Sequence, residues 1–226
     1  MENDSAIDSR KVVLIGMMGS GKSSTGRRLA RALQWSFLDL DESIERRAGR
    51  SIRDIFATDG ESAFRDLEEN ELRLAVSESG PLVIAAGGGI VIREANRQML
   101  SRVDEVIWLH APVDVLAQRV GARARRQEDH RPLVDGDPHD RLNAIWEQRK
   151  DLYKAVATVV VAVENQTLDD VVRQLTEVVE HSEIPNRKNP ESPILDDATP
   201  DVPSATSSAT SSAASLSTAI DQQGES

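Results

Sequence analysis

The sequence contains no cysteine. A disulfide framework, a thiolate metal site and a cysteine nucleophile are therefore excluded, and the absence fits a reducing compartment. No apolar run approaches the roughly 18 to 20 residues that a membrane-spanning helix needs. The first ten residues, MENDSAIDSR, are acidic and polar, unlike a secretory signal or an Arg-rich transit peptide. We expect a cytoplasmic protein with no membrane partner.

Positive charge is in deficit, since 27 Lys and Arg face 38 Asp and Glu and the net charge is −11. A field of this sign repels the phosphates of nucleic acids and of lipid head groups. We therefore expect no nucleic-acid partner. Any anionic ligand must be held by a local cluster of arginine, lysine and backbone amides.

Aromatic residues are missing from residues 182–226, where Ser, Thr, Ala and Pro dominate. Such a segment cannot bury enough apolar surface to offset its chain entropy, so we predict a disordered C-terminal tail. Residues 1–10 are predicted to be a disordered N-terminus. Residues 11–181 then form one domain, for which a hydrophobic content of 39% is sufficient. We expect this protein to be a monomer.

Between these ends, short apolar runs alternate with helical patterns. The runs lie at residues 11–16, 36–40, 81–86, 105–110 and 158–163. Each is nearly continuous in apolar residues, as parallel strands covered on both faces are. The segments between them carry apolar residues at spacings of three and four, which is typical of helices. The alternation predicts an α/β fold, with an open five-stranded parallel sheet, helices on both faces, and a ligand at the carboxyl ends of the strands.

The stretch GMMGSGKS at residues 16–23 matches the pattern G-x-x-x-x-G-K-[ST], whose fixed positions are Gly16, Gly21, Lys22 and Ser23. An apolar run precedes it and a helical pattern follows it, as a phosphate-binding loop requires. Glycines let N–H groups approach phosphate oxygens, Lys22 adds positive charge, and Ser23 offers a hydroxyl to Mg²⁺. A plain glycine turn is the alternative, but the pattern arises by chance in only about one such chain in a hundred. The predicted nucleotide-binding residues in this loop are Gly19, Ser20, Gly21, Lys22, Ser23 and Ser24.

Two aspartates, Asp39 and Asp41, come at the end of the second apolar run. In an extended strand both carboxylates point to the same side, where one can serve a metal ion and the other a hydroxyl substrate. Alternatively, Asp41 caps the short helix expected after it, and Asp39 completes a turn. Beside a phosphate loop we favour the functional interpretation.

The order of the motifs resembles that of shikimate kinase. The phosphate loop is followed by DLD, by GRSIRDIFATDGESAFRDLE, by GGG after the third run, and then by RPL and EQRKDLY. The resemblance extends from the first strand to the last helix. It implies a P-loop kinase fold and transfer of the γ-phosphoryl group of ATP, with Mg²⁺, to the 3-hydroxyl of shikimate. The products are shikimate 3-phosphate and ADP.

The resemblance also implies roles for individual residues. Ser23 and Asp39 serve the Mg²⁺, and Asp41 binds the substrate hydroxyls as the candidate base or orienter of the attacking oxygen. Arg131, before Pro132, is implied to be a lid arginine that reaches ATP and belongs with Lys22 and Asp41 in the catalytic set. The implied substrate-binding residues are Asp41, Phe56, Phe64, Arg65, Gly87, Gly88, Gly89 and Arg149.

Arg65 and Arg149 would bind the substrate carboxylate, because a guanidinium fork suits a planar carboxylate. From the residues alone, Arg65 is better explained by a surface ion pair with Glu61, Glu68 or Glu69 on the same helix. Arg149 could be one charge among several on a solvated helix face. The two phenylalanines alone fit a hydrophobic core, and the glycines a flexible turn.

Some alternatives stay open. The candidate arginines for the adenine are Arg119, Arg123, Arg125 and Arg126. A related enzyme such as a gluconate kinase shares the loop and the fold, but it gives no reason for two arginines around a ring-bearing acid. A catalytically silent nucleotide-binding regulator, with the tail recruiting a partner, is disfavoured by the intact Lys22, Asp39, Asp41 and Arg131.

Overall fold

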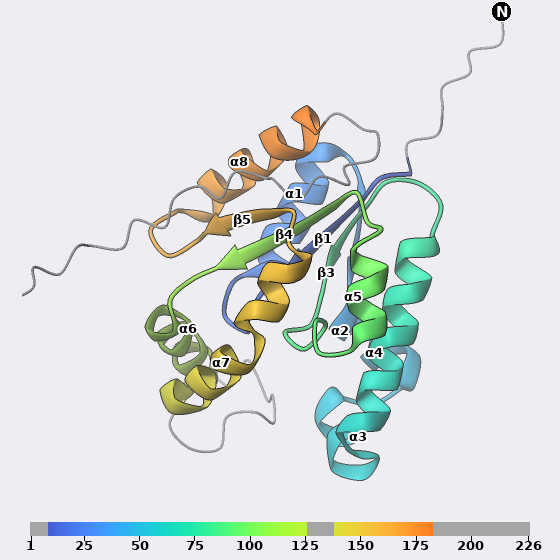
Figure 1. Cartoon of the computed structure of the whole chain (residues 1–226), viewed down its shortest axis with the longest axis vertical. Coiled ribbons are helices and arrows are strands. Elements are labelled where there is room, and N and C mark those ends of the chain that lie inside the picture. The colour runs from blue at the N-terminus through green and yellow to red at the C-terminus, as the bar shows by residue number, and fades with distance from the viewer. Residues whose placement is uncertain (1–8, 126–137, 183–226) are drawn as a thin grey trace, which may run out of the picture. The chain divides into compact units, whose positions relative to one another are not determined.

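The computed structural model describes residues 9–125 and 138–182 (Figure 1). The predicted lid arginine, Arg131, lies outside these residues, as do most of the two ends for which we predict disorder. Those three expectations stay predictions.

Five strands form one parallel sheet in the order β2-β3-β1-β4-β5. The strands are β1 (Lys11–Ile15), β2 (Ser36–Asp39), β3 (Leu82–Ala85), β4 (Glu105–His110) and β5 (Val159–Ala162). Every residue of β1 and of β3 is buried, which explains why their sequences are apolar throughout rather than alternating. The predicted five-stranded parallel sheet is confirmed, each strand within about a residue of the expected run.

Helices cover both faces of the sheet. They are α1 (Lys22–Leu33), α2 (Leu40–Ala48), α3 (Ile52–Thr58), α4 (Gly60–Ser77), α5 (Glu94–Leu100), α6 (Val113–Arg125), α7 (Pro138–Val156) and α8 (Leu168–His181). Figure 1 shows α1 and α8 packed together on one side of the sheet, with α4, α5 and α7 on the other. In the described part of the chain, no helix combines the length and apolar composition needed to cross a lipid bilayer.

Helix α3 is absent from the sequence-based prediction. Its first turn is capped by Ser51, whose hydroxyl accepts a hydrogen bond from the backbone N–H of Asp54 at 3.1 Å. The helix has only seven residues, too few for a clear helical period. It forms a small second core with α2 and α4, in which the buried residues are Ile44, Ile55 and Phe64.

The topology brings three loops to one edge of the sheet. The segments that follow β1, β2 and β3 all begin at the carboxyl ends of parallel, adjacent strands. They carry the phosphate loop (residues 16–23), the two aspartates and the glycines at 87–89, in that order. Ligands of open parallel sheets bind at this edge, so the fold places the predicted site residues where a ligand can reach them together.

Candidate active site

The phosphate loop has a backbone that only glycine adopts easily. Gly16, Gly19 and Gly21 have positive φ angles of 140°, 83° and 91°. A Cβ atom on Gly16 would lie 2.5 Å from the carbonyl oxygen of Leu109, so the loop is packed against β4 too closely for a side chain at this position. Helix α1 begins at Lys22 directly after the loop, and its first three residues, Lys22 to Ser24, line the same pocket as the loop.

Lys22 lies inside this loop rather than in solvent. Its side-chain ammonium donates hydrogen bonds to the carbonyl oxygens of Gly16 at 2.8 Å and Met17 at 3.0 Å. The residue is buried, so its charge acts in a region of low dielectric constant. Ser20 is also buried, and its hydroxyl oxygen has no hydrogen-bond partner among the described residues. The loop therefore holds a cation and a spare hydroxyl close to where a phosphate would lie.

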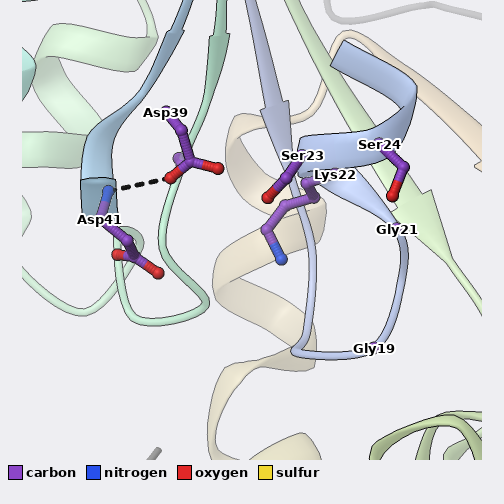
Figure 2. Close-up of a pocket in the computed structure, with 8 residues that line it drawn as sticks. Gly19, Gly21, Lys22, Ser23, Ser24, Asp39 and Asp41 are labelled. Carbon is purple, nitrogen blue, oxygen red and sulfur yellow. Dashed lines mark hydrogen bonds between the residues drawn. The ribbon is translucent and has the colours of Figure 1, made fainter. Parts of the chain in front are cut away.

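Asp39 and Asp41 lie across the same pocket from Lys22 and Ser23 (Figure 2). The strand ends at Asp39, and Asp41 already belongs to the first turn of α2. The expectation that both residues are extended, with carboxylates set by the strand period, is therefore wrong. The capping alternative is also reversed, because Asp39 caps α2 by accepting from the N–H of Asp41 at 3.1 Å and of Glu42 at 3.4 Å. Both carboxylates nevertheless line one pocket, whose lining residues are Gly19, Gly21, Lys22, Ser23, Ser24, Asp39, Asp41 and Ala86.

The oxygen donors of this pocket fit a magnesium ion. Mg²⁺ is held by one or two protein oxygens together with nucleotide phosphates and water, and does not need a cage of side chains. The cap uses the Oδ1 atom of Asp39, while the hydroxyl of Ser23 stands at the start of α1 on the same pocket. No cluster of three or more His, Asp or Glu residues suited to a metal occurs in residues 9–125 or 138–182. Asp39 and Ser23 therefore suit a metal ion whose other ligands are nucleotide phosphates and water.

A buried ion pair adjoins the pocket. Arg65 and Glu68 are 7% and 1% exposed, and the Nη1 atom of Arg65 donates to Glu68 Oε2 at 2.7 Å. Arg65 also contacts Glu61, at the helix surface. Burial opposes the charge of Arg65, but the two glutamates outweigh it and raise the pKa of the guanidinium. Burial raises the pKa of the Glu68 carboxyl, although the Arg65 guanidinium pulls it down.

The triple glycine (Gly87, Gly88 and Gly89) is packed directly against these charges. A Cβ atom on Gly87 would lie 2.8 Å from both Asp41 Oδ1 and Glu68 Oε1, and one on Gly89 would collide with the Arg65 guanidinium. A flexible turn would not need such close packing. Glycine is required here because acid and base side chains occupy the space on both sides of the chain. Within the described part of the chain, the N–H groups of these three glycines donate no backbone hydrogen bond.

Arg149 points inward from α7. Its Nη1 atom donates to the carbonyl oxygen of Gly88 at 3.0 Å, and the residue is half-buried. A Cβ on Gly88 would lie 3.5 Å from the backbone nitrogen of Met18, so the triple glycine also abuts the phosphate loop. Two arginines, an aspartate and the phosphate loop are therefore brought together around three glycines. Neither arginine is a solvated surface charge of the kind that the residues alone suggested.

The two predicted pocket phenylalanines pack on each other. The rings of Phe56 and Phe64 have centroids 4.8 Å apart, and the guanidinium of Arg65 lies over the Phe64 ring at 5.1 Å. Phe64 is buried in the second core and Phe56 packs at its edge. Phe64 therefore contacts Arg65 directly, and Phe56 packs against Phe64.

Three residues make contacts at this site that the sequence-based prediction does not include. Glu68 appears there only as a surface partner of Arg65, and its burial could be recognised from the apolar positions that flank it on α4. Tyr153 donates a hydrogen bond to Gly88, although nothing in the sequence links residues 65 positions apart. Arg119, one of the four arginines considered for adenine, donates to the carbonyl oxygens of Gly19 at 3.4 Å and Val163 at 2.8 Å. It therefore joins the phosphate loop to the segment after β5.

Comparison with known proteins gives a consistent result. A family model described as shikimate kinase matches residues 18–180. The chain is 42% identical over 168 residues to a shikimate kinase of Symbiobacterium thermophilum, which covers 74% of this chain and 94% of that protein. It is 43% identical over 143 residues to a bifunctional shikimate kinase/3-dehydroquinate synthase of Thermotoga maritima, covering 63% of this chain and 27% of that longer protein. Among solved structures, the shikimate kinase from Acinetobacter baumannii in complex with shikimate has a TM-score of 0.71 and 32% identity, and the match covers 78% of this chain and 96% of that one.

Proposed function

The chain belongs to the shikimate kinase family, and we propose that it transfers the γ-phosphoryl group of ATP to the 3-hydroxyl of shikimate at the edge of its sheet. One observation carries this proposal. The phosphate loop and Asp41 line one pocket. The triple glycine contacts Asp41, Arg65 and Arg149, so a carboxylate site would adjoin the phosphate site. The carboxylate of shikimate would account for the two arginines beside the phosphate site.

At the nucleotide end, the amides of the phosphate loop and of the first turn of α1 bind the phosphate oxygens. The ammonium of Lys22 would replace its hydrogen bonds to the carbonyl oxygens of Gly16 and Met17 by bonds to the phosphate oxygens. There it would stabilise the negative charge that develops on the γ-phosphoryl group. Ser23 and Asp39 would hold the Mg²⁺, which neutralises phosphate charge when bound. Arg119 donates to Gly19 of the phosphate loop and to Val163, which follows β5, so it lies between these two segments.

At the acceptor end, Asp41 receives the substrate hydroxyl. Its carboxylate lies between the phosphate pocket and the triple glycine, so a hydroxyl bound to it can face the γ-phosphorus. As the oxygen attacks, its O–P bond forms, the bond from the γ-phosphorus to the bridging oxygen of ADP breaks, and the hydroxyl proton passes to Asp41. The reaction then needs no covalent enzyme intermediate.

The substrate carboxylate is bound by Arg65 and Arg149. Arg65 is held by its ion pair with Glu68 and by contact with the Phe64 ring. Little side-chain entropy is therefore lost when Arg65 binds the acid. The free amides of the triple glycine offer further donors to substrate oxygens. Phe56 and Phe64 would exclude water from one side of the site.

Arg131 lies outside the described residues, and its assignment to ATP as a lid arginine remains part of this proposal. A lid would exclude water, which otherwise competes as a phosphoryl acceptor. We also propose that the enzyme acts as a monomer in the cytoplasm. The lack of cysteine supports a reducing compartment.

The test is ADP release measured in a coupled assay with shikimate, gluconate, a nucleoside monophosphate or no acceptor. We expect acceleration by shikimate alone, dependent on Mg²⁺. The product should be shikimate 3-phosphate by mass and by phosphorus NMR. Acceleration by another acceptor alone would overturn the substrate, and nucleotide binding without transfer to any acceptor would indicate a silent regulator.

A further inference from the structure

Tyr153 is the largest fully buried side chain of the described domain, with 0% exposure, and it lies on α7 one turn after Arg149. Its hydroxyl donates to the carbonyl oxygen of Gly88 at 2.5 Å. Arg149 donates to the same oxygen. The central glycine of the proposed substrate loop thus accepts two hydrogen bonds from one helix.

The position of the hydroxyl is set by packing. The Tyr153 ring stacks on Trp108 of β4, with centroids 5.6 Å apart and an angle of 20° between planes, and Trp108 packs in turn on Trp146. A phenol this deep in the protein needs a partner for its O–H group, and Gly88 supplies it. Burial raises the pKa of Tyr153 well above its usual value, which keeps the hydroxyl a donor throughout the pH range of an enzyme assay.

Arg149 would have to move when the substrate binds, whereas Tyr153 would not. A guanidinium that binds a carboxylate has to turn toward it and can weaken its bond to Gly88. The peptide bond is planar, so the carbonyl of Gly88 and the N–H of Gly89 point in opposite directions. If the carbonyl moved when Arg149 turned, the amide offered to the substrate would move as well. A second donor that does not touch the substrate prevents this.

We propose that Tyr153 is a positioning residue for the acceptor site, whose hydroxyl holds the Gly88 carbonyl, and with it the triple glycine, in place while Arg149 turns to the substrate carboxylate. The inference rests on the proposed function. It assigns Tyr153 an effect on the acid substrate and none on ATP.

The test compares Tyr153→Phe with Trp146→Phe. The first removes the hydroxyl and keeps the ring, and Arg149 still satisfies the Gly88 carbonyl, so the variant should fold. The second perturbs the same aromatic cluster without touching the glycines. For Tyr153→Phe we expect the KM and Kd of shikimate to rise by about 3- to 10-fold, the effect of one lost neutral hydrogen bond, with kcat and the KM of ATP within about twofold. Trp146→Phe should leave all of these within about twofold.

Hydrogen exchange gives a second measurement that needs no turnover. Amides of residues 87–92 should exchange faster in Tyr153→Phe than in the parent protein, and should be unchanged in Trp146→Phe. An unchanged KM for shikimate, or equal rises in the KM of both substrates, would overturn the inference. The parent enzyme separates the two proposals, because failure to phosphorylate shikimate there refutes the function, whereas activity with no effect of Tyr153→Phe refutes only the positioning role.

Discussion

Removing Arg65 should damage the protein in two separable ways, because this arginine neutralises Glu68 and is our proposed ligand of the substrate carboxylate. In Arg65→Ala, Glu68 is left at 1% exposure without its partner. Breaking a buried ion pair from one side costs about 3 to 5 kcal/mol of unfolding free energy. For a domain of this size that is a fall in Tm of roughly 6 to 20 °C. Loss of a charge-assisted contact should also raise the KM for shikimate by about 10- to 100-fold.

The loss of stability should depend on pH in a definite direction. The pKa of Glu68 is raised in the folded state, so the folded protein binds this proton more tightly than the unfolded chain does. The stability that the group contributes is therefore present at low pH and disappears as the pH rises through the raised pKa. Without Arg65 the pKa of Glu68 rises further. We expect Arg65→Ala to lose more stability at pH 8 than at pH 5 in urea unfolding.

Arg93 provides a matched control. It too bridges two carboxylates on α4, those of Asp66 and Glu69, but at the surface. Arg93→Ala should cost at most about 1 kcal/mol and leave the KM for shikimate unchanged. The double variant Arg65→Ala/Glu68→Gln should regain part of the stability, since no buried charge remains. Equal losses in the Arg65 and Arg93 variants, or a greater loss at pH 5, would refute the reasoning.

Three further variants test other parts of the site. Lys22→Ala should lower kcat by about 100-fold or more with an unchanged circular dichroism spectrum, because charge stabilisation at the phosphates is lost; residual kcat near the parent value would exclude this role. Asp41→Asn should lower kcat by about 10²- to 10⁴-fold while shikimate still binds in calorimetry, and a change in binding alone would remove Asp41 as a base. Gly89→Ala places a Cβ atom on the Arg65 guanidinium, so it should raise the KM for shikimate and leave that for ATP unchanged.

The parts of the molecule that the sequence predicts are those with local causes. Strands buried on both faces need continuous apolar runs, and a loop whose amides bind phosphate needs glycines at set intervals, so both can be recognised within a few residues. The sheet edge follows from the topology. The family resemblance singled out Arg65 and Arg149 as candidate carboxylate ligands. From the neighbouring residues alone, both would have been predicted to be surface charges.

What could not be predicted depends on contacts between distant residues or on a choice between similar geometries. Asp39 and Asp41 both suit a helix cap, and only the observed end of β2 shows that Asp39 provides it. The contact of Glu68 with Gly87 depends on how α4 lies against the triple glycine, which no local pattern encodes. The bond from Tyr153 to Gly88 joins two segments that meet only when α7 folds onto β4.

The cap at the start of α2 links two tasks that could have been separate. One carboxylate oxygen of Asp39 is committed to the amides of Asp41 and Glu42. A shift of this helix start would move the proposed metal ligand and the proposed base by the same rotation. A substitution of Asp39 would therefore remove the helix cap together with the proposed metal ligand, whereas a substitution of Asp41 would leave the cap intact, because only its backbone N–H takes part.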